Sequence, residues 1–284
     1  MGAFNISSLG NFVNKINDIK RVADKDLEFF YRGIKSELPV EKNQPKIYRG
    51  YIDKESEIIE STLTNKFSYF QNSKTAIEKL EIMQHYGLPT RLLDITSNPL
   101  VALFFACQVS DHDEAGQVFV YKVKKDYVKY NDSDIVSILS NIAFMDKNFE
   151  LEVDEEDNTK LKTSTIHYQK LISQIKKEKP SFQEKIKRKH VDNYVVCVIP
   201  NYNNERIVAQ QGAFLLYGID TIKTKCAEIS GKQDKYITYE EFIIKHDKKS
   251  DILNELANVG ITRDVLFPEL DNYIDCIDRK FKNE

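Results

Sequence analysis

Five polar side chains that could bind or activate a ligand are crowded into residues 84–96, around a glycine-leucine-proline turn: Gln84, His85, Arg91, Asp94 and Thr96. The apolar residues between them predict that this segment lies against a core, where each polar group needs a hydrogen-bond partner. One interpretation is a structural corner, in which Arg91 pairs with Asp94 or caps carbonyl groups and His85 satisfies a helix end. The other is a ligand site, because a junction of strand and helix presents backbone N–H groups and a positive helix end.

Other patterns that indicate catalysis or metal binding are missing from the sequence. There is no glycine-rich phosphate loop, nucleophile elbow or His-Glu-x-x-His motif. The remaining histidines are scattered, and the four cysteines lie far apart without Cys-x-x-Cys spacing. We therefore expect no metal site and no disulfide framework, and we expect a reducing cytoplasm as the compartment.

The elements around the polar segment follow from periodicity and capping residues. Helical spacing covers 7–19, 54–70 and 73–85, and the last of these helices has Ser73 or Thr75 as its cap. A short strand is predicted over 27–33 and an extended segment over 90–95. Asn98-Pro99 then caps a helix over 99–108 that is apolar nearly all round and should be buried.

The second half of the chain alternates between strand signals and a polar region. Strands are predicted over 117–123, 193–200, 214–217 and 236–244, with a helix over 250–257 that stops at Gly260. Residues 126–190 are polar, with an acidic patch at 150–157 and a lysine-rich helix predicted over 160–190. We expect one α+β domain over 1–284, a small mixed sheet with packed helices, and a helical insertion at 126–190.

Composition limits the classes of partner. The chain has 284 residues, 41% hydrophobic and 30% charged, which is ordinary for a folded protein. Its net charge of -3 gives no overall attraction to nucleic acid or anionic membranes. No apolar run approaches the roughly 18 residues needed to span a bilayer. We expect no membrane partner, secretory signal or lipid anchor.

Three segments together resemble the FRG domain family. They are Tyr31-Arg32-Gly33, the run Gln84-His85-Tyr86-Gly87-Leu88-Pro89-Thr90-Arg91-Leu92-Leu93-Asp94, and the set Arg206, Gln210, Gly212 and Phe214. The family is named for a Phe-Arg-Gly triplet, and tyrosine here replaces the phenylalanine. The likeness runs over about residues 25–275. It implies a protein of the bacterial or phage type, without assigning an activity.

A more distant likeness concerns mono-ADP-ribosyltransferases. Their first motif is similar to Tyr31-Arg32-Gly33, and their second to Asp94-Ile95-Thr96-Ser97 followed by Ala102-x-Phe104-x-Ala106. Their third strand carries a glutamate or glutamine, a place that Gln210 or Gln211 could take. No Glu-x-Glu motif stands there, which argues against transfer to arginine.

This likeness implies an ADP-ribosyltransferase-like core with NAD as substrate. Tyr31, Gly33 and Gln84 would help to bind NAD, and Arg32 and Arg91 would hold its phosphates or ribose. His85 and Thr96 would orient the nicotinamide ribose. Asp94 would stabilise developing positive charge, and Gln210 or Gln211 would complete the catalytic set.

The expected function is therefore that of an NAD-dependent effector with a phage-defence or toxin-like role. Its acceptor would be an unknown protein or nucleic acid. The alternative is a non-catalytic recognition domain that binds a nucleotide or nucleic acid. The lysines of 160–190 offer a nucleic-acid patch in that case, although they equally suit a solvated helix face paired with the acidic patch.

Overall fold

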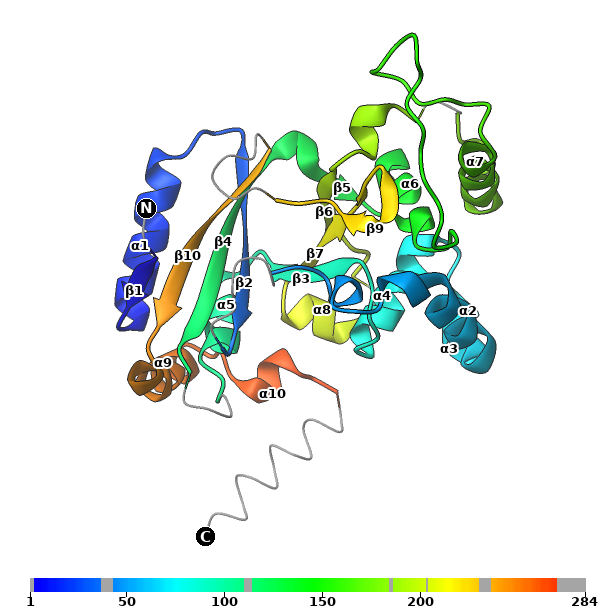
Figure 1. The fold of residues 1–284 in the computed structure, drawn as a ribbon. Coiled ribbons are helices and arrows are strands. Elements are labelled where there is room, and N and C mark those ends of the chain that lie inside the picture. The colour runs from blue at the N-terminus through cyan, green and yellow to red at the C-terminus, as the bar shows by residue number, and fades with distance from the viewer. Residues whose placement is uncertain are drawn as a thin grey trace.

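The computed structural model describes residues 3–36, 43–109, 114–183, 186–202, 204–229 and 236–269. Ten strands form within these ranges: β1 (Phe4–Ile6), β2 (Leu27–Ile34), β3 (Leu92–Thr96), β4 (Gly116–Lys124), β5 (Val128–Tyr130), β6 (Val195–Ile199), β7 (Gly212–Tyr217), β8 (Ile219–Asp220), β9 (Ile222–Cys226) and β10 (Ile237–Ile244). Eight of them build one sheet in the order β1-β10-β4-β2-β3-β7-β6-β5, and β8 pairs with β9 (Figure 1).

Ten α-helices lie between or after these strands within the described ranges. They are α1 (Leu9–Val22), α2 (Glu55–Asn65), α3 (Phe67–Phe70), α4 (Ala76–His85), α5 (Pro99–Ala106), α6 (Asp134–Ile142), α7 (Ile166–Glu178), α8 (Glu205–Ala209), α9 (His246–Asn258) and α10 (Arg263–Leu266). The eight-stranded sheet mixes parallel outer pairs, β1 with β10 and β5 with β6, with antiparallel inner pairs. The mixed α+β class predicted from the sequence is confirmed.

Two groups of helices pack side by side on one face of this sheet (Figure 1). Helices α1, α5 and α9 share a core with β1, β10, β4 and β2. Helices α2, α4, α6 and α7 share another core with β3, β7 and β6. The opposite face carries a third cluster, which includes Phe30, Leu93 and Tyr121. The helical face is thus divided into two halves.

The boundary between the halves lies between β2 and β3, and the sheet is weakest there. Strand β2 pairs with β4 over eight residues, but its register with β3 consists of one pair, Tyr31 with Thr96. A continuous ladder would use the backbone groups of both strands along their length. We call the line where β2 and β3 diverge the seam.

Helix α5 packs so closely on β2 that one position must be glycine. A Cβ atom added to Gly33 would lie 1.7 Å from the backbone oxygen of Ala102, a distance that no substitution can accommodate without moving the helix. The glycine of the Tyr-Arg-Gly motif therefore has a packing role, which fixes α5 beside the seam.

Local capping signals placed two helices correctly. Thr75 accepts a hydrogen bond from the backbone of Glu78, whose side chain returns to the Thr75 backbone, so α4 begins with a capping box. Asn98 accepts from the backbone N–H of Leu100, with Pro99 at the first helical position of α5. Both ends of the polar segment are therefore held by helices with defined starts.

Several predicted elements were wrong in extent. The helix expected over 54–70 is two helices, α2 and α3, with Lys66 between them. The lysine-rich helix expected over 160–190 is α7, thirteen residues that end before Pro180. Residues 126–190 are not purely helical, because β5 extends the main sheet at its edge. Sequence patterns also missed β1 and the short helix α8.

Candidate functional site

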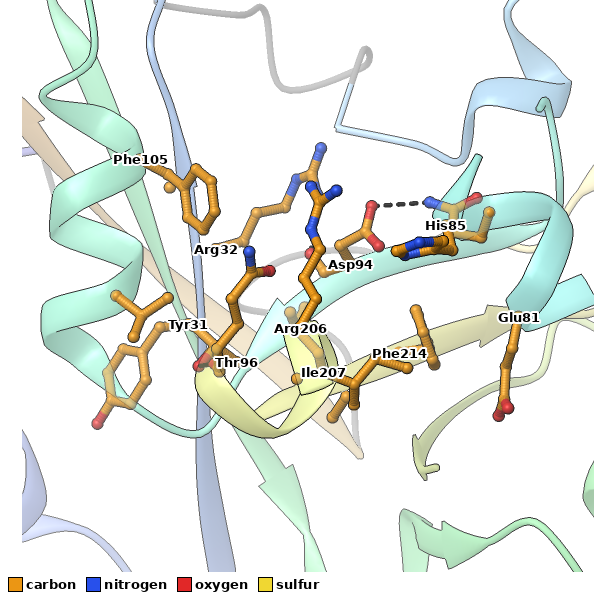
Figure 2. Close-up of a pocket in the computed structure, with 17 residues that line it drawn as sticks. Tyr31, Arg32, Glu81, His85, Asp94, Thr96, Phe105, Arg206, Ile207 and Phe214 are labelled. Atoms are coloured by element: carbon orange, nitrogen blue, oxygen red, sulfur yellow. Dashed lines mark hydrogen bonds between the residues drawn. The ribbon is translucent and has the colours of Figure 1, made fainter. Parts of the chain in front are cut away.

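A cavity of about 250 Å³ opens at the seam. Both halves of the molecule line it, through β2 and α5 on one side and through α4, β3, α8 and β7 on the other (Figure 2). Eight residues predicted for the site line this cavity: Tyr31, Arg32, Gly33, Gln84, His85, Asp94, Thr96 and Gln210. The three sequence segments, although up to 180 positions apart, thus meet at one place.

Two arginines give the cavity positive charge. The guanidinium groups of Arg32, from β2, and Arg206, from α8, point into the same space beside Phe105 and Asp94 (Figure 2). Arg32 donates to the backbone oxygen of Asp94 at 2.8 Å, and its buried Nε has no hydrogen-bond partner among the described residues. Arg206 lies 3.9 Å from the Glu269 carboxylate. Two incompletely paired guanidinium groups favour an anion between them.

A short chain of hydrogen bonds holds the carboxylate of the cavity. Gln84 donates to the Asp94 carboxylate at 2.7 Å, and the Thr90 hydroxyl donates to the amide oxygen of Gln84 at 2.6 Å. Gln84 is thereby fixed at both ends of its amide. The Asp94 side chain is exposed at the cavity while its orientation is set.

Thr96 and Gln210 fix the backbone at the other end of the cavity. The Thr96 hydroxyl donates to the backbone oxygen of Gln210 at 2.7 Å and accepts from the backbone N–H of Asn98 at 3.0 Å. The Gln210 amide donates to the backbone oxygen of Leu266 at 2.9 Å. These contacts tie β3, α8 and α10 together, so both side chains act first as positioning groups.

His85 and Glu81 lie one turn apart on α4 and line the wall of the cavity. Burial lowers the pKa of the His85 imidazole, and the neighbouring Arg206 lowers that pKa further. Burial raises the pKa of the Glu81 carboxyl to about 7, against the opposing effect of a hydrogen bond from Asn131. At neutral pH the wall therefore holds a neutral imidazole and a carboxyl group that is partly protonated.

Arg91 does not line the cavity. Its side chain is fully buried, pairs with the Glu55 carboxylate, and donates to Tyr48 and to the backbone oxygen of Tyr217. The pairing of Arg91 with Asp94 considered from the sequence is wrong, because Glu55 takes that place. The structure leaves Arg91 with no route to a ligand in this cavity.

Gln211 also lies outside the cavity lining. Its backbone has a φ of +47°, and its backbone oxygen accepts hydrogen bonds from the N–H and hydroxyl of Ser97. The left-handed conformation turns the chain from α8 into β7 and leaves the side chain exposed. Of the two glutamines, only Gln210 lines the cavity.

Tyr31 is at the cavity floor with its ring in the core. Burial raises the pKa of its phenol, and the hydroxyl has no hydrogen-bond partner in the described ranges. The hydroxyl points away from the two arginines (Figure 2). Tyr31 therefore contributes its ring and backbone to the site, and not a proton donor.

Sequence reasoning assigned no role to four side chains of the cavity: Arg206, Glu81, Phe105 and Phe214. Arg206 and Phe214 were part of a motif, so their spacing was the signal. Glu81 lies one turn before His85 on α4, and its predicted position on the helix was the available clue. Phe105 reads as a core residue of an apolar helix, and nothing in the sequence separates it from its buried neighbours.

The described ranges contain neither a metal-binding cluster nor a membrane-spanning helix. There, no group of three His, Cys, Asp or Glu side chains is placed to hold a metal ion. No described helix is both long and apolar enough to cross a membrane. The site thus offers cations, a carboxylate, an imidazole and aromatic rings. That combination suits a ligand with phosphate and ribose groups.

Comparisons with known proteins give one match. The family model of the FRG domain matches residues 27–115, which include β2, α4, β3 and α5. No curated protein and no solved structure matches the chain. The matched residues include the cavity lining from β2, α4, β3 and α5, while Arg206, Gln210 and Phe214 lie beyond them. The sequence resemblance to the FRG domain is thus confirmed for residues 27–115, which match the family model.

Proposed function

We propose that the seam cavity binds the nicotinamide-ribosyl end of NAD and promotes transfer of its ADP-ribosyl group. The observation that carries this is the meeting of Arg32, Asp94 and Arg206 at one cavity. Ligand sites commonly enclose about 300–1,000 Å³. A cavity of about 250 Å³ suits one end of a dinucleotide, with the remainder lying across its mouth.

In the proposed reaction the carboxylate and the two arginines act on different parts of NAD. The bond between nicotinamide N1 and ribose C1′ breaks, and its electron pair leaves with nicotinamide, which becomes neutral. Positive charge develops on the ribose, where the Asp94 carboxylate stabilises it. Arg32 and Arg206 hold the pyrophosphate. The acceptor's nucleophile then bonds to C1′ and loses its proton to solvent or to a carboxylate of the site.

Neighbouring groups support these tasks through position. Gln84 sets the direction of the Asp94 carboxylate. Thr96 holds the backbone at Gln210, so that β3 and α8 keep a fixed separation. The neutral imidazole of His85 can exchange hydrogen bonds with ribose hydroxyls without adding charge. Preorganisation of this kind lowers the cost of reaching the transition state.

The wider role is also a proposal. The family resemblance favours a phage-defence or toxin-like effector that modifies a protein or nucleic acid. The described cysteines Cys107, Cys197 and Cys226 are free thiols, which a reducing cytoplasm favours. Both features suit action inside a bacterial cell.

Release of labelled nicotinamide from NAD tests the proposal. We expect the wild type to release nicotinamide and Asp94→Asn to do so about 100-fold more slowly, because the carboxylate charge is lost. Binding of NAD should change little in this variant. Asp53→Asn, an exposed aspartate before α2, is the matched control. A folded wild type that binds NAD and releases no nicotinamide would contradict the catalytic part.

One observation favours a second candidate, a non-catalytic domain that binds a nucleotide. At the third motif the Gln210 amide lines the cavity but donates to the Leu266 backbone oxygen, and the Gln211 side chain is exposed outside the lining, which weakens the case for a catalytic glutamine. Alanine at both positions separates the two candidates. An enzyme should lose turnover and keep its fold, whereas a binding domain should change mainly in affinity. The lysines of α7 would be tested next with nucleic acid.

A further inference from the structure

A second cavity, of about 240 Å³, adjoins the first beside α4. The two share three lining residues, Glu81, His85 and Ile207. The second cavity differs in charge, because two carboxyl groups line it and no lysine or arginine among the described residues does. The two cavities thus share a wall, and of the two only the first is lined by arginines.

Glu81 is the polar group at this wall that lacks a full set of partners. Its side chain is 5% exposed, and one carboxylate oxygen accepts from Asn131 at 3.0 Å. Among the described residues, Asn131 is the hydrogen-bond donor to this carboxylate, and its bond goes to one of the two oxygens. Burial raises the pKa of this carboxyl to about 7, as expected where no cation accompanies it. A buried carboxyl group with an uncommitted oxygen is suited to a positively charged donor.

Two exposed tyrosines stand at the entrance of the second cavity. Tyr69 and Tyr86 are 55% and 61% exposed, and their rings meet edge to face at 5.3 Å. Tyrosine faces attract cations, and a planar guanidinium also stacks on them. Asn72 and Asn204 add side-chain amides to the same lining.

We propose that this second cavity is a binding site for a basic side chain of a peptide, above all the guanidinium of arginine. The guanidinium lies against Tyr69 and Tyr86 and donates to the free carboxylate oxygen of Glu81. Neutral His85 offers a further acceptor and does not repel the cation. Phosphate-bearing ligands are disfavoured here by Glu78 and Glu81. The proposal does not depend on NAD as the ligand of the first cavity.

Titration calorimetry with a nine-residue glycine peptide carrying one central arginine tests this site. The comparison peptide has glutamine in place of arginine, and a lysine peptide and spermidine separate guanidinium from ammonium. We expect the arginine peptide to bind most tightly. Glu81→Gln should weaken that binding about tenfold, as expected for the loss of a charged hydrogen-bond acceptor.

Three further variants, one in the lining and two controls outside it, keep the test valid if Glu81→Gln alters the fold. Tyr86→Leu changes an exposed ring and should weaken arginine-peptide binding about threefold. Phe67→Leu and Glu205→Gln remove an exposed ring and an exposed carboxylate outside the lining and should leave binding unchanged. Equal binding of the arginine and glutamine peptides would overturn the proposal, as would unchanged affinity in both Glu81→Gln and Tyr86→Leu. Tighter binding of lysine or spermidine would overturn the guanidinium preference.

Discussion

Arg91 and Arg32 come from two neighbouring segments of one family motif set, yet they occupy opposite environments. Arg91 is enclosed with Glu55 and with Lys223, which lies 3.3 Å from the same carboxylate. Arg32 lies in the seam, and its Nε lacks a hydrogen-bond partner within the described ranges. A buried cation with a complete set of partners stabilises the fold. A cation in a cavity with an unused donor is available to a ligand.

The carboxylates of the two regions differ in the same way. Glu55 is buried and pairs with two cations, whereas Glu81 has one amide partner and lines two cavities. Substitutions in the two regions should therefore differ in their effects on stability and on ligand binding.

Glu55→Gln should have the largest effect. It leaves Arg91 and Lys223 buried without their shared anion, and breaking such a pair costs about 3–5 kcal/mol in the free energy of unfolding. Urea unfolding followed by circular dichroism measures this. Glu57→Gln on the same helix is the control, because its exposed pair with Lys54 contributes about 1 kcal/mol at most. Similar losses in both variants would remove the distinction.

Glu81→Gln should change stability in a pH-dependent way. The folded pKa of about 7 lies above the ordinary carboxyl value of 4.5, so the folded state holds the proton more tightly. The stability that this proton contributes is present below pH 4.5 and is lost as the pH rises through about 7. Glutamine does not titrate. The difference in the free energy of unfolding, variant minus wild type, should therefore rise by up to about 3 kcal/mol between pH 4.5 and pH 8.

Urea unfolding at the two pH values measures this difference. The shift reflects burial first, with the Asn131 hydrogen bond opposing it and Glu78 adding to it. Glu60→Gln, an exposed position on α2, provides the control. A stability difference that is the same at pH 4.5 and pH 8 would show that Glu81 does not titrate with a raised pKa.

Arg32→Ala should cost little stability, less than about 1 kcal/mol, since its single described hydrogen bond goes to a backbone oxygen at the cavity. Urea unfolding measures this loss in the free energy of unfolding and compares it with the loss in Glu55→Gln. A loss as large as that of Glu55→Gln would mean that Arg32 is a structural residue and that the contrast between the two arginines is false.

The smallest expected effect is on His85. Because Arg206 lowers the pKa of the imidazole, Arg206→Ala should bring that pKa closer to its ordinary value. An NMR titration of the histidine side chains measures the change. Arg188→Ala, on the distant turn beside Asp192, serves as the control. An unchanged His85 titration would place Arg206 too far from the wall to act on it.

The sequence predicted those parts of the fold whose causes are local. Thr75 and Asn98 cap their helices through residues two or three positions away, and the apolar run after Pro99 could only be a buried helix. The partner of Arg91 could not be predicted from the sequence, because Glu55 stands 36 positions earlier in a helix with an ordinary amphipathic pattern. Nothing local shows which carboxylate will be buried.

The sequence predicted which residues form the site better than it predicted how they are arranged. Arg32, Asp94 and Gln210 were named from motif resemblance, and the topology brings them together. The exclusion of Gln211 depends on a left-handed backbone at a helix end, which glutamine does not signal. The role of Glu81 depends on two cavities that meet at α4, a property of packing across the seam. The insertion assigned to 126–190 stays a prediction.

Binding of NAD, measured by titration calorimetry with wild type, Arg32→Ala and Arg206→Ala, tests the central claim most directly. We expect the wild type to bind and each alanine variant to lose about tenfold or more in affinity, because each removes a charged donor from the anion site. The two variants should unfold at nearly the wild-type urea concentration. Absence of NAD binding by the folded wild type, or binding that survives both substitutions, would contradict the assignment of the seam cavity as a nucleotide site.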